Sequence, residues 1–192
     1  MKKLLALLMV AVMVFAFTAC GSTESDSDLA YIQDKGTMIV GITEYEPMNF
    51  KDANGDWTGF DTEFALLVGE KLGVDIEFIE IEWGSKIMEL ESKAIDCVWN
   101  GMTITDEVKN GMNVTNPYVV NAQVVVMDAS KVANYKTVED LADLKFVAEA
   151  GSAGEAAIAD NGLDGAYTAV AAQSDALLEV MSGSADACVI DI

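Results

Sequence analysis

Asn100-Gly101-Met102-Thr103-Ile104-Thr105-Asp106-Glu107 is the stretch that decides the fold. It follows the apolar segment 95–99, which has the pattern of a short strand, and it leads into a polar segment with the pattern of a helix. In an open α/β sheet, ligands bind just beyond the carboxyl ends of the strands, where free backbone N–H groups and small hydroxyls suit a carboxylate. The same pattern is also typical of a strand that passes into a capped helix with no ligand, so the neighbouring motifs must distinguish the two.

Three further motifs surround this stretch. Gly59-Phe60-Asp61 opens a helix upstream, Trp83 precedes another helix, and Asn116-Pro117-Tyr118 follows downstream. Their order resembles the extracellular solute-binding proteins of family 3, the polar amino-acid-binding proteins of ABC transporters, from about Thr37 to Ile192. The resemblance implies an α/β fold of the two-lobed, type II periplasmic-binding-protein kind, in which each lobe is a mostly parallel sheet flanked by helices. It also implies a chain that is incomplete at the C-terminus, because family chains continue further.

The N-terminus has the three-part pattern of an export signal. Met1-Lys2-Lys3 is basic, residues 4–17 are almost wholly apolar, and Thr18-Ala19-Cys20 closes the run with small residues. The run is too short for a transmembrane helix, and Cys20 after Ala19 resembles a lipobox, whose cysteine becomes the lipidated first residue. The alternative is an ordinary secretory peptide with an incidental cysteine. We expect residues 1–19 to be a lipoprotein signal peptide and residues 20–34 to be the lipidated cysteine with a flexible tether.

Composition excludes several classes of function. The chain contains 11 Lys, no Arg and no His against 32 acidic residues, and its formal net charge is −21. Such a chain would be repelled by nucleic acid and by anionic lipid. The absence of His excludes imidazole catalysis and His metal sites, and we expect no cofactor and no metal.

Cys97 and Cys188 lie in two apolar segments far apart in the sequence. We favour two buried free thiols, which behave as small hydrophobic groups, over a disulfide, whose geometry a sequence cannot establish. A catalytic thiol would need a basic neighbour, and the sequence shows none.

Strand and helix patterns alternate along the rest of the chain. Strands are expected at residues 37–42, 75–82, 95–100, 122–126, 145–150, 167–171 and 185–190, and helices at residues 29–35, 61–72, 85–92, 138–141, 155–160 and 174–181. Repeated β-α-β units favour parallel strands with right-handed crossovers. The alternation restarts after a crossover near residues 118–123. We therefore expect lobe 1 to span residues 35–120 and an incomplete lobe 2 to span residues 121–192, with a cleft between them.

Two of the helices carry more specific predictions. In the helix over 61–72, Asp61 is expected to cap the first turn and Gly73 to end the last one. Its apolar stripe is expected at Phe64, Leu67, Val68 and Leu72. In the helix over 85–92, the side chains expected to face inward are Ile87, Met88 and Leu90.

The resemblance also implies ligand-binding positions in lobe 1. Tyr45 and Trp83 match two aromatic rings that would hold a ligand side chain by apolar and cation–π contacts, and Glu44 beside Tyr45 would approach a ligand amine. Both rings could instead belong to the core. The positions matching those that meet the amino-acid head group are Asn100, Gly101 and Thr103.

In lobe 2, the resemblance implies a carboxylate site and an ammonium site. Gly151, Ser152 and Ala153 match a turn whose N–H groups meet the ligand carboxylate at the start of a helix. Asp191 matches the acid that pairs with the α-ammonium in a strong charge-assisted bond. The alternative for Asp191 is a helix cap after its strand.

Val108 departs from the family pattern, which places an Arg there as a bidentate clamp on the α-carboxylate of the ligand. Val cannot donate a hydrogen bond, and the adjacent Lys109 would point about 100° away on a helix. The ligand would then lack a free α-carboxylate, or would hold it only through N–H groups.

The interpretation implied by the resemblance is an exported solute-binding component of an ABC importer and not an enzyme. It would be lipid-anchored at the outer face of the cytoplasmic membrane, or periplasmic. Its partners would be a small polar ligand (an amino acid or a related amine), an ABC permease, and the membrane through the N-terminal lipid, and it would be a monomer. One alternative is a sensory ligand-binding module, although the sequence shows no downstream membrane helix or kinase. The other is a dehydratase-like enzyme on the same fold, with Glu44 as its acid and the carboxylate clamp missing.

Overall fold

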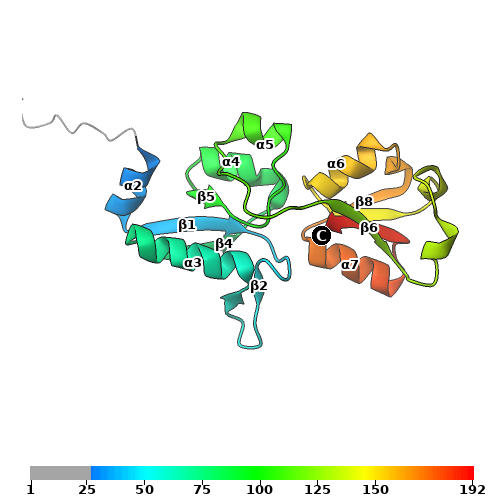
Figure 1. Ribbon diagram of the computed structural model, residues 1–192, viewed down its shortest axis with the longest axis horizontal. Helices are drawn as coiled ribbons and strands as arrows, with labels where there is room; N and C mark the ends of the chain where they lie inside the picture. Colours follow the sequence, from blue (N-terminus) through cyan, green and yellow to red (C-terminus); the bar gives the residue numbers. More distant parts are fainter. Residues whose placement is uncertain (1–26) are drawn as a thin grey trace, which may run out of the picture.

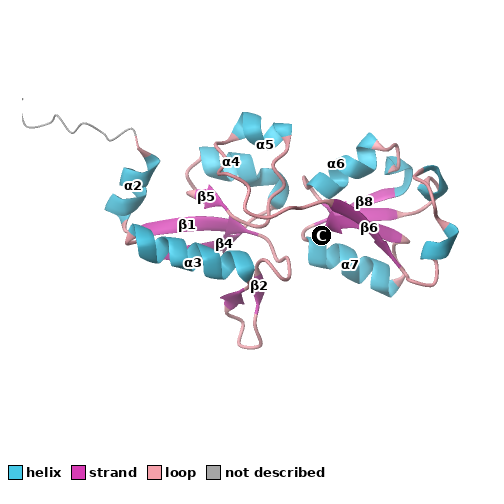
Figure 2. Ribbon diagram, in the orientation of Figure 1, coloured by secondary structure: helices cyan, strands magenta, loops and turns pink. Residues whose placement is uncertain are grey.

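Two α/β lobes lie side by side in the computed structural model, and the chain crosses between them in the segment that leads into β6 (Figure 1). The structure describes residues 27–192, so the expected signal peptide and Cys20 lie outside the described residues. Figure 2 shows that both lobes combine a sheet with helices packed against it. The expected two-lobed fold is confirmed.

Lobe 1 is built on a three-stranded parallel sheet in the order β4-β1-β5. Its strands are β1 (Thr37–Ile42), β4 (Asp75–Glu80) and β5 (Cys97–Val98), and an antiparallel hairpin adds β2 (Phe50–Lys51) and β3 (Trp57–Thr58). Its helices are α2 (Asp28–Lys35), α3 (Phe60–Leu72), the 3₁₀ turn η1 (Trp83–Ser85), α4 (Lys86–Glu91) and α5 (Asp106–Gly111). The strand expected at 95–100 is therefore much shorter than predicted.

Lobe 2 is a four-stranded sheet in the order β6-β9-β7-β8. Its strands are β6 (Gln123–Met127), β7 (Phe146–Glu149), β8 (Tyr167–Val170) and β9 (Ala187–Asp191). The strands β7, β8 and β9 run parallel, and β6 pairs antiparallel with β9. The helices are α6 (Ala153–Asp160) and α7 (Gln173–Ser182), with 3₁₀ turns η2 (Val132–Asn134), η3 (Glu139–Leu141) and η4 (Asp164–Ala166).

The final part of the expected flexible tether is helical. Over residues 28–34 the tether prediction is wrong, because α2 occupies this segment. Ser27 caps the helix by accepting a hydrogen bond from the N–H of Ala30 at 3.4 Å, and Gly36 ends it with a positive φ of 78°. Ile32 is buried against the core residues of β1, which holds the helix on the lobe.

The buried face of α3 is not the apolar stripe expected from the sequence. Ala65 is fully buried, and a side chain at Gly69 would meet Ile76 of β4 at 2.6 Å. The helix therefore approaches the sheet so closely that only small residues fit between them. Phe64 and Leu67 are 36% and 57% exposed, whereas Leu72 packs against the core of lobe 1, so only part of the expected stripe faces inward.

The central strand β7 is buried at all four positions, as expected for a strand covered on both faces. Phe146 and Ala148 belong to one core cluster with Ile158 of α6, whereas Val147 packs with Ala176 of α7 in another. The carboxyl end of β7 is thus held rigidly. The last residue of this buried strand is Glu149.

Both described cysteines are free, which confirms the expected absence of a bridge between Cys97 and Cys188. They belong to β5 of lobe 1 and β9 of lobe 2. Burial raises the pKa of Cys97 to about 12 and that of Cys188 to about 11, so both are unreactive thiols at neutral pH.

Candidate functional site

The two lobes meet where the carboxyl ends of β1 and β7 face each other. The hydrogen bonds that cross this interface include those from Ser174 Oγ to the carbonyl of Glu44 at 3.3 Å, from Lys86 Nζ to the carbonyl of Gly151 at 2.9 Å, and from Thr103 Oγ1 to Asp191 Oδ1 at 3.3 Å. Four of these six residues are among those that the sequence singled out. The carboxyl ends of parallel strands are the usual place for ligands in α/β sheets, so we take this interface as the candidate site.

Asp191 is the centre of a polar network at the interface. Its Oδ1 accepts from Asn121 Nδ2 at 2.9 Å and Gln123 Nε2 at 2.6 Å, in addition to Thr103. Its Oδ2 accepts from Gln173 Nε2 at 2.8 Å. Asp191 is the last residue of β9, at the carboxyl end of the strand. Three of the four donors are on Oδ1, so Oδ2, which accepts from Gln173, can accept one further donor.

The sequence did not reveal the amides of this network. Gln123 stands opposite Asp191 in the antiparallel pairing of β6 with β9, and Asn121 lies just before β6. Gln173, the first residue of α7, also accepts a bond from the N–H of Asp191 at 2.8 Å. The register of β6 against β9 brings Gln123 beside Asp191, and this register cannot be read from the sequence.

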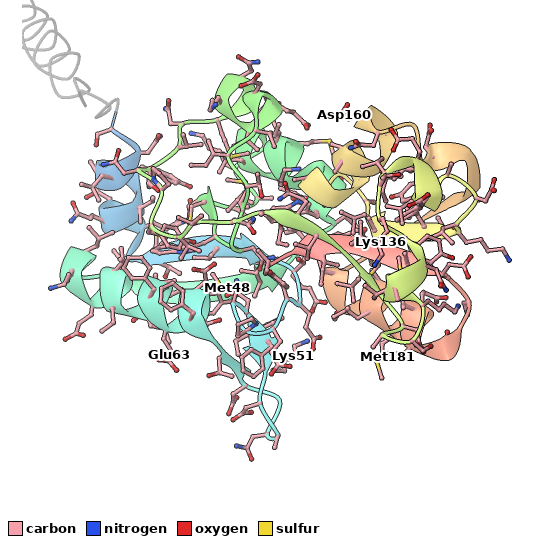
Figure 3. The ribbon with its side chains drawn as sticks, turned by 45° about the vertical axis from the view of Figure 1, so that its right-hand side comes forward. Met48, Lys51, Glu63, Lys136, Asp160 and Met181 are labelled. Atoms are coloured by element: carbon pink, nitrogen blue, oxygen red, sulfur yellow. The ribbon has the colours of Figure 1, made fainter. Side chains whose placement is uncertain are left out.

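Tyr45 and Gly101 pack against each other in lobe 1. A side chain at Gly101, whose φ is +63°, would meet Met48 Cγ at 3.3 Å and Tyr45 Cε1 at 3.4 Å. Met48 is labelled in Figure 3, beside α3. Burial raises the pKa of Tyr45 to about 12, with further contributions from Asp191 and Asp61, so its hydroxyl stays protonated. Tyr45 is therefore close to the acid at the centre of the network.

Asp61 does not cap α3, contrary to the expectation. The residue before the helix is Gly59, which provides no side-chain bond, and Asp61 is fully buried within the first turn. Its carboxylate accepts from the N–H of Gly101 and, at 2.9 Å, from the hydroxyl of Tyr118. Asp61 therefore fixes the turn at Gly101, and its burial raises its pKa.

Asn100 has an internal role in lobe 1. Its Oδ1 accepts from the N–H of Thr43 at 3.1 Å and from Asn49 Nδ2 at 2.7 Å, and its Nδ2 donates to Thr43 Oγ1 at 2.8 Å. The side chain is 3% exposed. Of the three head-group positions expected in lobe 1, Thr103 has its side chain in the interface, whereas Asn100 uses its amide to hold the loop after β1.

Lys86 is a buried cation that the sequence analysis missed. It is 3% exposed, and its Nζ donates to the carbonyl of Trp83 at 3.3 Å as well as to Gly151. The Nζ lies 5.1 Å from the centroid of the Trp83 ring, which is itself buried. Met88, which was expected to face inward, is 61% exposed, so α4 directs Lys86 rather than Met88 into the interface. Burial lowers the pKa of Lys86, while Glu107, Glu149 and Glu155 oppose that effect.

The turn at Gly151 brings the two backbones into direct contact. Gly151 has a φ of +71°, and a side chain there would stand 2.5 Å from the Cα of Gly84. Its N–H donates to Glu155 Oε2 at 2.6 Å, while Ser152 Oγ accepts from the N–H of Glu155 at 3.1 Å. This arrangement is similar to a capping box at the start of α6, except that Glu155 bonds to the N–H of Gly151 and not to that of the N-cap residue Ser152. The N–H of Gly151 is therefore already used, and Ala153, the first residue of α6, has an N–H with no partner inside the helix.

Val108 is 2% exposed in α5, where its N–H donates to the capping hydroxyl of Thr105 at 3.2 Å. The neighbouring Lys109 has a side chain that is 54% exposed and pairs with Asp106 at 3.3 Å. Neither residue brings a positive charge into the interface. That charge comes from Lys86.

Two hollows border the candidate site. A cavity of about 570 Å³ is lined by Thr43, Glu44, Glu82, Ser174 and Asp175. A groove of about 1800 Å³ crosses lobe 1 and reaches Tyr45, Asn100, Gly101 and Thr103 at one end. Exposed apolar side chains line this groove, among them Phe64, Tyr118 and Val119. Within residues 27–192, no helix is long and apolar enough to cross a membrane.

Comparison with known proteins identifies relatives across most of the chain. The family model of the bacterial extracellular solute-binding proteins, family 3, matches residues 38–187. The L-cystine-binding protein TcyJ of Escherichia coli (strain K12) is 32% identical over 137 residues, which cover 69% of this chain and 52% of that protein. The arginine-binding extracellular protein ArtP of Bacillus subtilis (strain 168) is 34% identical over 142 residues, which cover 73% of this chain and 53% of that protein. The chain thus spans about half the length of these curated relatives.

Among solved structures, the chain is similar to the ancestral amino acid-binding protein AncCDT-1, a precursor of cyclohexadienyl dehydratase. The TM-score is 0.81 at 34% sequence identity, and the match covers 86% of this chain and 74% of that chain. The similarity in fold therefore extends over both lobes.

Proposed function

Because the chain belongs to the bacterial extracellular solute-binding proteins of family 3, we propose that it is the ligand-binding component of an ABC importer. It binds a small polar molecule, an amino acid or a related amine, between its two lobes and delivers it to a permease. Binding closes the lobes about the connecting segment, as in other hinged binding proteins. The protein acts as a monomer and performs no catalysis in this proposal.

The observation that carries the proposal is the cluster of opposite charges at the lobe interface. Asp191 and Glu149 come from lobe 2 and Lys86 from lobe 1, and all three are held at the carboxyl ends of strands or at the start of a helix. A zwitterionic ligand presents an ammonium to the acids and a carboxylate to the lysine. Such charge-assisted bonds are strong when water is excluded.

The names of the relatives support this class of ligand. TcyJ is named as an L-cystine-binding protein and ArtP as an arginine-binding protein. Lys86 supplies the positive charge for a ligand carboxylate, so the missing clamp at Val108 does not exclude an amino acid. An enzyme on this fold is the alternative, because AncCDT-1 is described as a precursor of a dehydratase, but AncCDT-1 itself is described as an amino acid-binding protein.

The sequence pattern around Cys20 supports export and a lipid anchor on the outer face of the membrane. In this proposal the anchor keeps the binding lobes near the permease, and the acidic surface keeps them soluble.

A thermal-shift screen of the full chain tests the proposed function. The probes are L-arginine, L-histidine, L-cystine, the corresponding amides, and simple diamines. A ligand that binds only the folded state must raise the unfolding midpoint, so at least one probe is expected to do so. If no probe shifts the midpoint and the chain instead turns over a cyclohexadienyl acid, the enzyme alternative replaces the proposal.

A further inference from the structure

Glu149 is the acid of the interface whose capacity for hydrogen bonds is not filled. It is 1% exposed, and its Oε1 is buried with no hydrogen-bond partner among residues 27–192. A buried carboxyl oxygen without a donor is costly, and such atoms in a folded protein call for an explanation. Asp191, by contrast, receives four donors.

The position of Glu149 places it where both lobes can enclose a ligand. It ends the central strand β7, two residues before the Gly151 turn, and the Thr43 side chain of lobe 1 lies beside it. Its carboxyl group is therefore held between the lobes by a rigid, fully buried strand.

The charges that face Glu149 come from three elements. Lys86 of α4 is the cation nearby, and Asp191 of β9 and Asp175 of α7 are acids. Lys86 forms no ion pair within 4.0 Å in the described part of the chain, because its Nζ is bonded to the carbonyls of Trp83 and Gly151. Glu149 thus lacks a direct cationic partner among residues 27–192.

We propose that Glu149 receives a cationic group of the ligand, an ammonium or a guanidinium, through its unpartnered Oε1. This deepens the proposed function, on which it rests, by assigning the cation site to a residue of β7 in addition to Asp191. A ligand cation provides both the missing hydrogen bond and the missing opposite charge.

The same arrangement couples ligand binding to the protonation state of Glu149. Burial raises the pKa of Glu149 to about 7, with Asp191 and Asp175 adding to the rise and Thr43 and Lys86 opposing it. A ligand cation favours the ionised form, so binding releases a proton when Glu149 is protonated beforehand. With a pKa near 7 the ionised fraction rises about tenfold between pH 6 and pH 8, and affinity for the cation rises by the same factor.

The test compares L-arginine with its neutral analogue L-citrulline, by calorimetric titration of the full chain at pH 6 and pH 8. The variants are Glu149→Gln, which mimics the protonated acid in shape, and Glu63→Gln as control, an exposed acid of α3 labelled in Figure 3. Glu149→Gln is expected to weaken L-arginine binding at least tenfold at pH 8 and to abolish the pH dependence. Glu63→Gln is expected to change neither.

The two analogues distinguish which cation Glu149 receives. If Glu149→Gln loses affinity for L-arginine alone, Glu149 receives the side-chain guanidinium. If it loses affinity equally for L-arginine and L-citrulline, Glu149 receives the α-ammonium. Retention of the wild-type affinity and pH dependence in Glu149→Gln overturns the inference and leaves the proposed function standing. Failure of every probe in the thermal-shift screen to bind the wild type overturns the proposed function, and the inference with it.

A second measurement needs no variant. Titrations of the wild type at pH 7 in two buffers with different ionisation enthalpies report the protons released on binding. Release of a fraction of a proton supports the inference, and none released contradicts it.

Discussion

Replacing Gly151 by Ala perturbs the closed arrangement of the lobes at a single defined point. The added Cβ would stand 2.5 Å from the Cα and 3.0 Å from the nitrogen of Gly84, in the opposite lobe. Carbon atoms in contact prefer about 3.5–4.0 Å, so the lobes must separate by roughly 1 Å here. The hydrogen bond from Lys86 to the carbonyl of Gly151, at 2.9 Å, is then lost.

Gly151→Ala is expected to change two free energies, that of lobe closure around a ligand and that of folding. A hydrogen bond from a charged group contributes about 1.5–3 kcal/mol, so closure around a ligand becomes less favourable by that amount. Affinity should fall about tenfold to 150-fold. The positive φ of 71° at Gly151 adds a separate strain of about 1–2 kcal/mol, which lowers folding stability in the open and closed states alike.

Gly84→Ala is the matched control, because its Cβ would meet nothing nearer than the carbonyl oxygen of Ala150 at 3.8 Å, an ordinary contact. Calorimetric titration with the best probe of the thermal-shift screen reports affinity, and urea unfolding reports stability. Gly84→Ala is expected to keep affinity within about threefold of the wild type. If Gly151→Ala loses stability but keeps wild-type affinity, the lobes do not meet at this point when ligand is bound, and the reasoning is refuted.

Four further changes test other parts of the account. Asp191→Asn should weaken ligand binding by about 1.5–3 kcal/mol in calorimetric titration, since a charged acceptor is lost, and unchanged affinity would remove Asp191 from the cation site. Burial raises the pKa of Glu149 to about 7, so the folded state binds this proton more tightly than the unfolded state does. The free energy of unfolding should therefore fall as pH rises from about 4.5 to about 7, by up to roughly 3 kcal/mol. Urea titrations at pH 5 and pH 8 should show this fall, and Glu149→Gln should reduce it; a fall of unchanged size would contradict the assignment. Cys20→Ala should move the protein from the membrane to the soluble fraction on fractionation, and an unchanged distribution would reject the lipid anchor. Leu67→Ser, at a position 57% exposed on α3, should reduce binding of a hydrophobic dye without loss of stability in urea, whereas dye binding equal to the wild type would show that this surface is covered in solution.

Periodicity was sufficient to predict the alternation of elements, because strands and helices bury apolar side chains at different spacings. The strand at 37–42 and the helix end at Gly73 agree with the structure, since Gly73 has a positive φ that ends the helix. The face of α3 was mispredicted for a physical reason. Apolar spacing finds the most hydrophobic face of a helix, but the close approach of the sheet at Gly69 selects the smallest one.

The candidate site was predictable only in part. The resemblance led to Thr103 and Asp191, which the structure brings into contact at 3.3 Å. It did not lead to Lys86 or Glu149, because a charged residue is ordinarily a surface residue and only tertiary packing buries it. One signal was present in the sequence: Glu149 ends an otherwise apolar strand, Phe146-Val147-Ala148, at its carboxyl end. Asn100 shows the opposite error: it was predicted to bind the ligand, but its amide bonds within lobe 1. A match to a motif position does not say whether the side chain faces a ligand or its own lobe.

The place of β9 in the sheet of lobe 2 has a consequence for the order of folding. Among the four strands of this sheet it is the last along the chain, yet it lies between β6 and β7 and pairs with both. Until residues 187–191 are available, β6 has no neighbour in the sheet and the apolar faces of α6 and α7 lack much of their cover. Lobe 2 therefore cannot complete its sheet as it emerges from the ribosome, and its nucleus requires contacts between distant parts of the chain, which slows folding. The same strand carries Asp191 at its end, so the step that closes the sheet also assembles the polar network between the lobes.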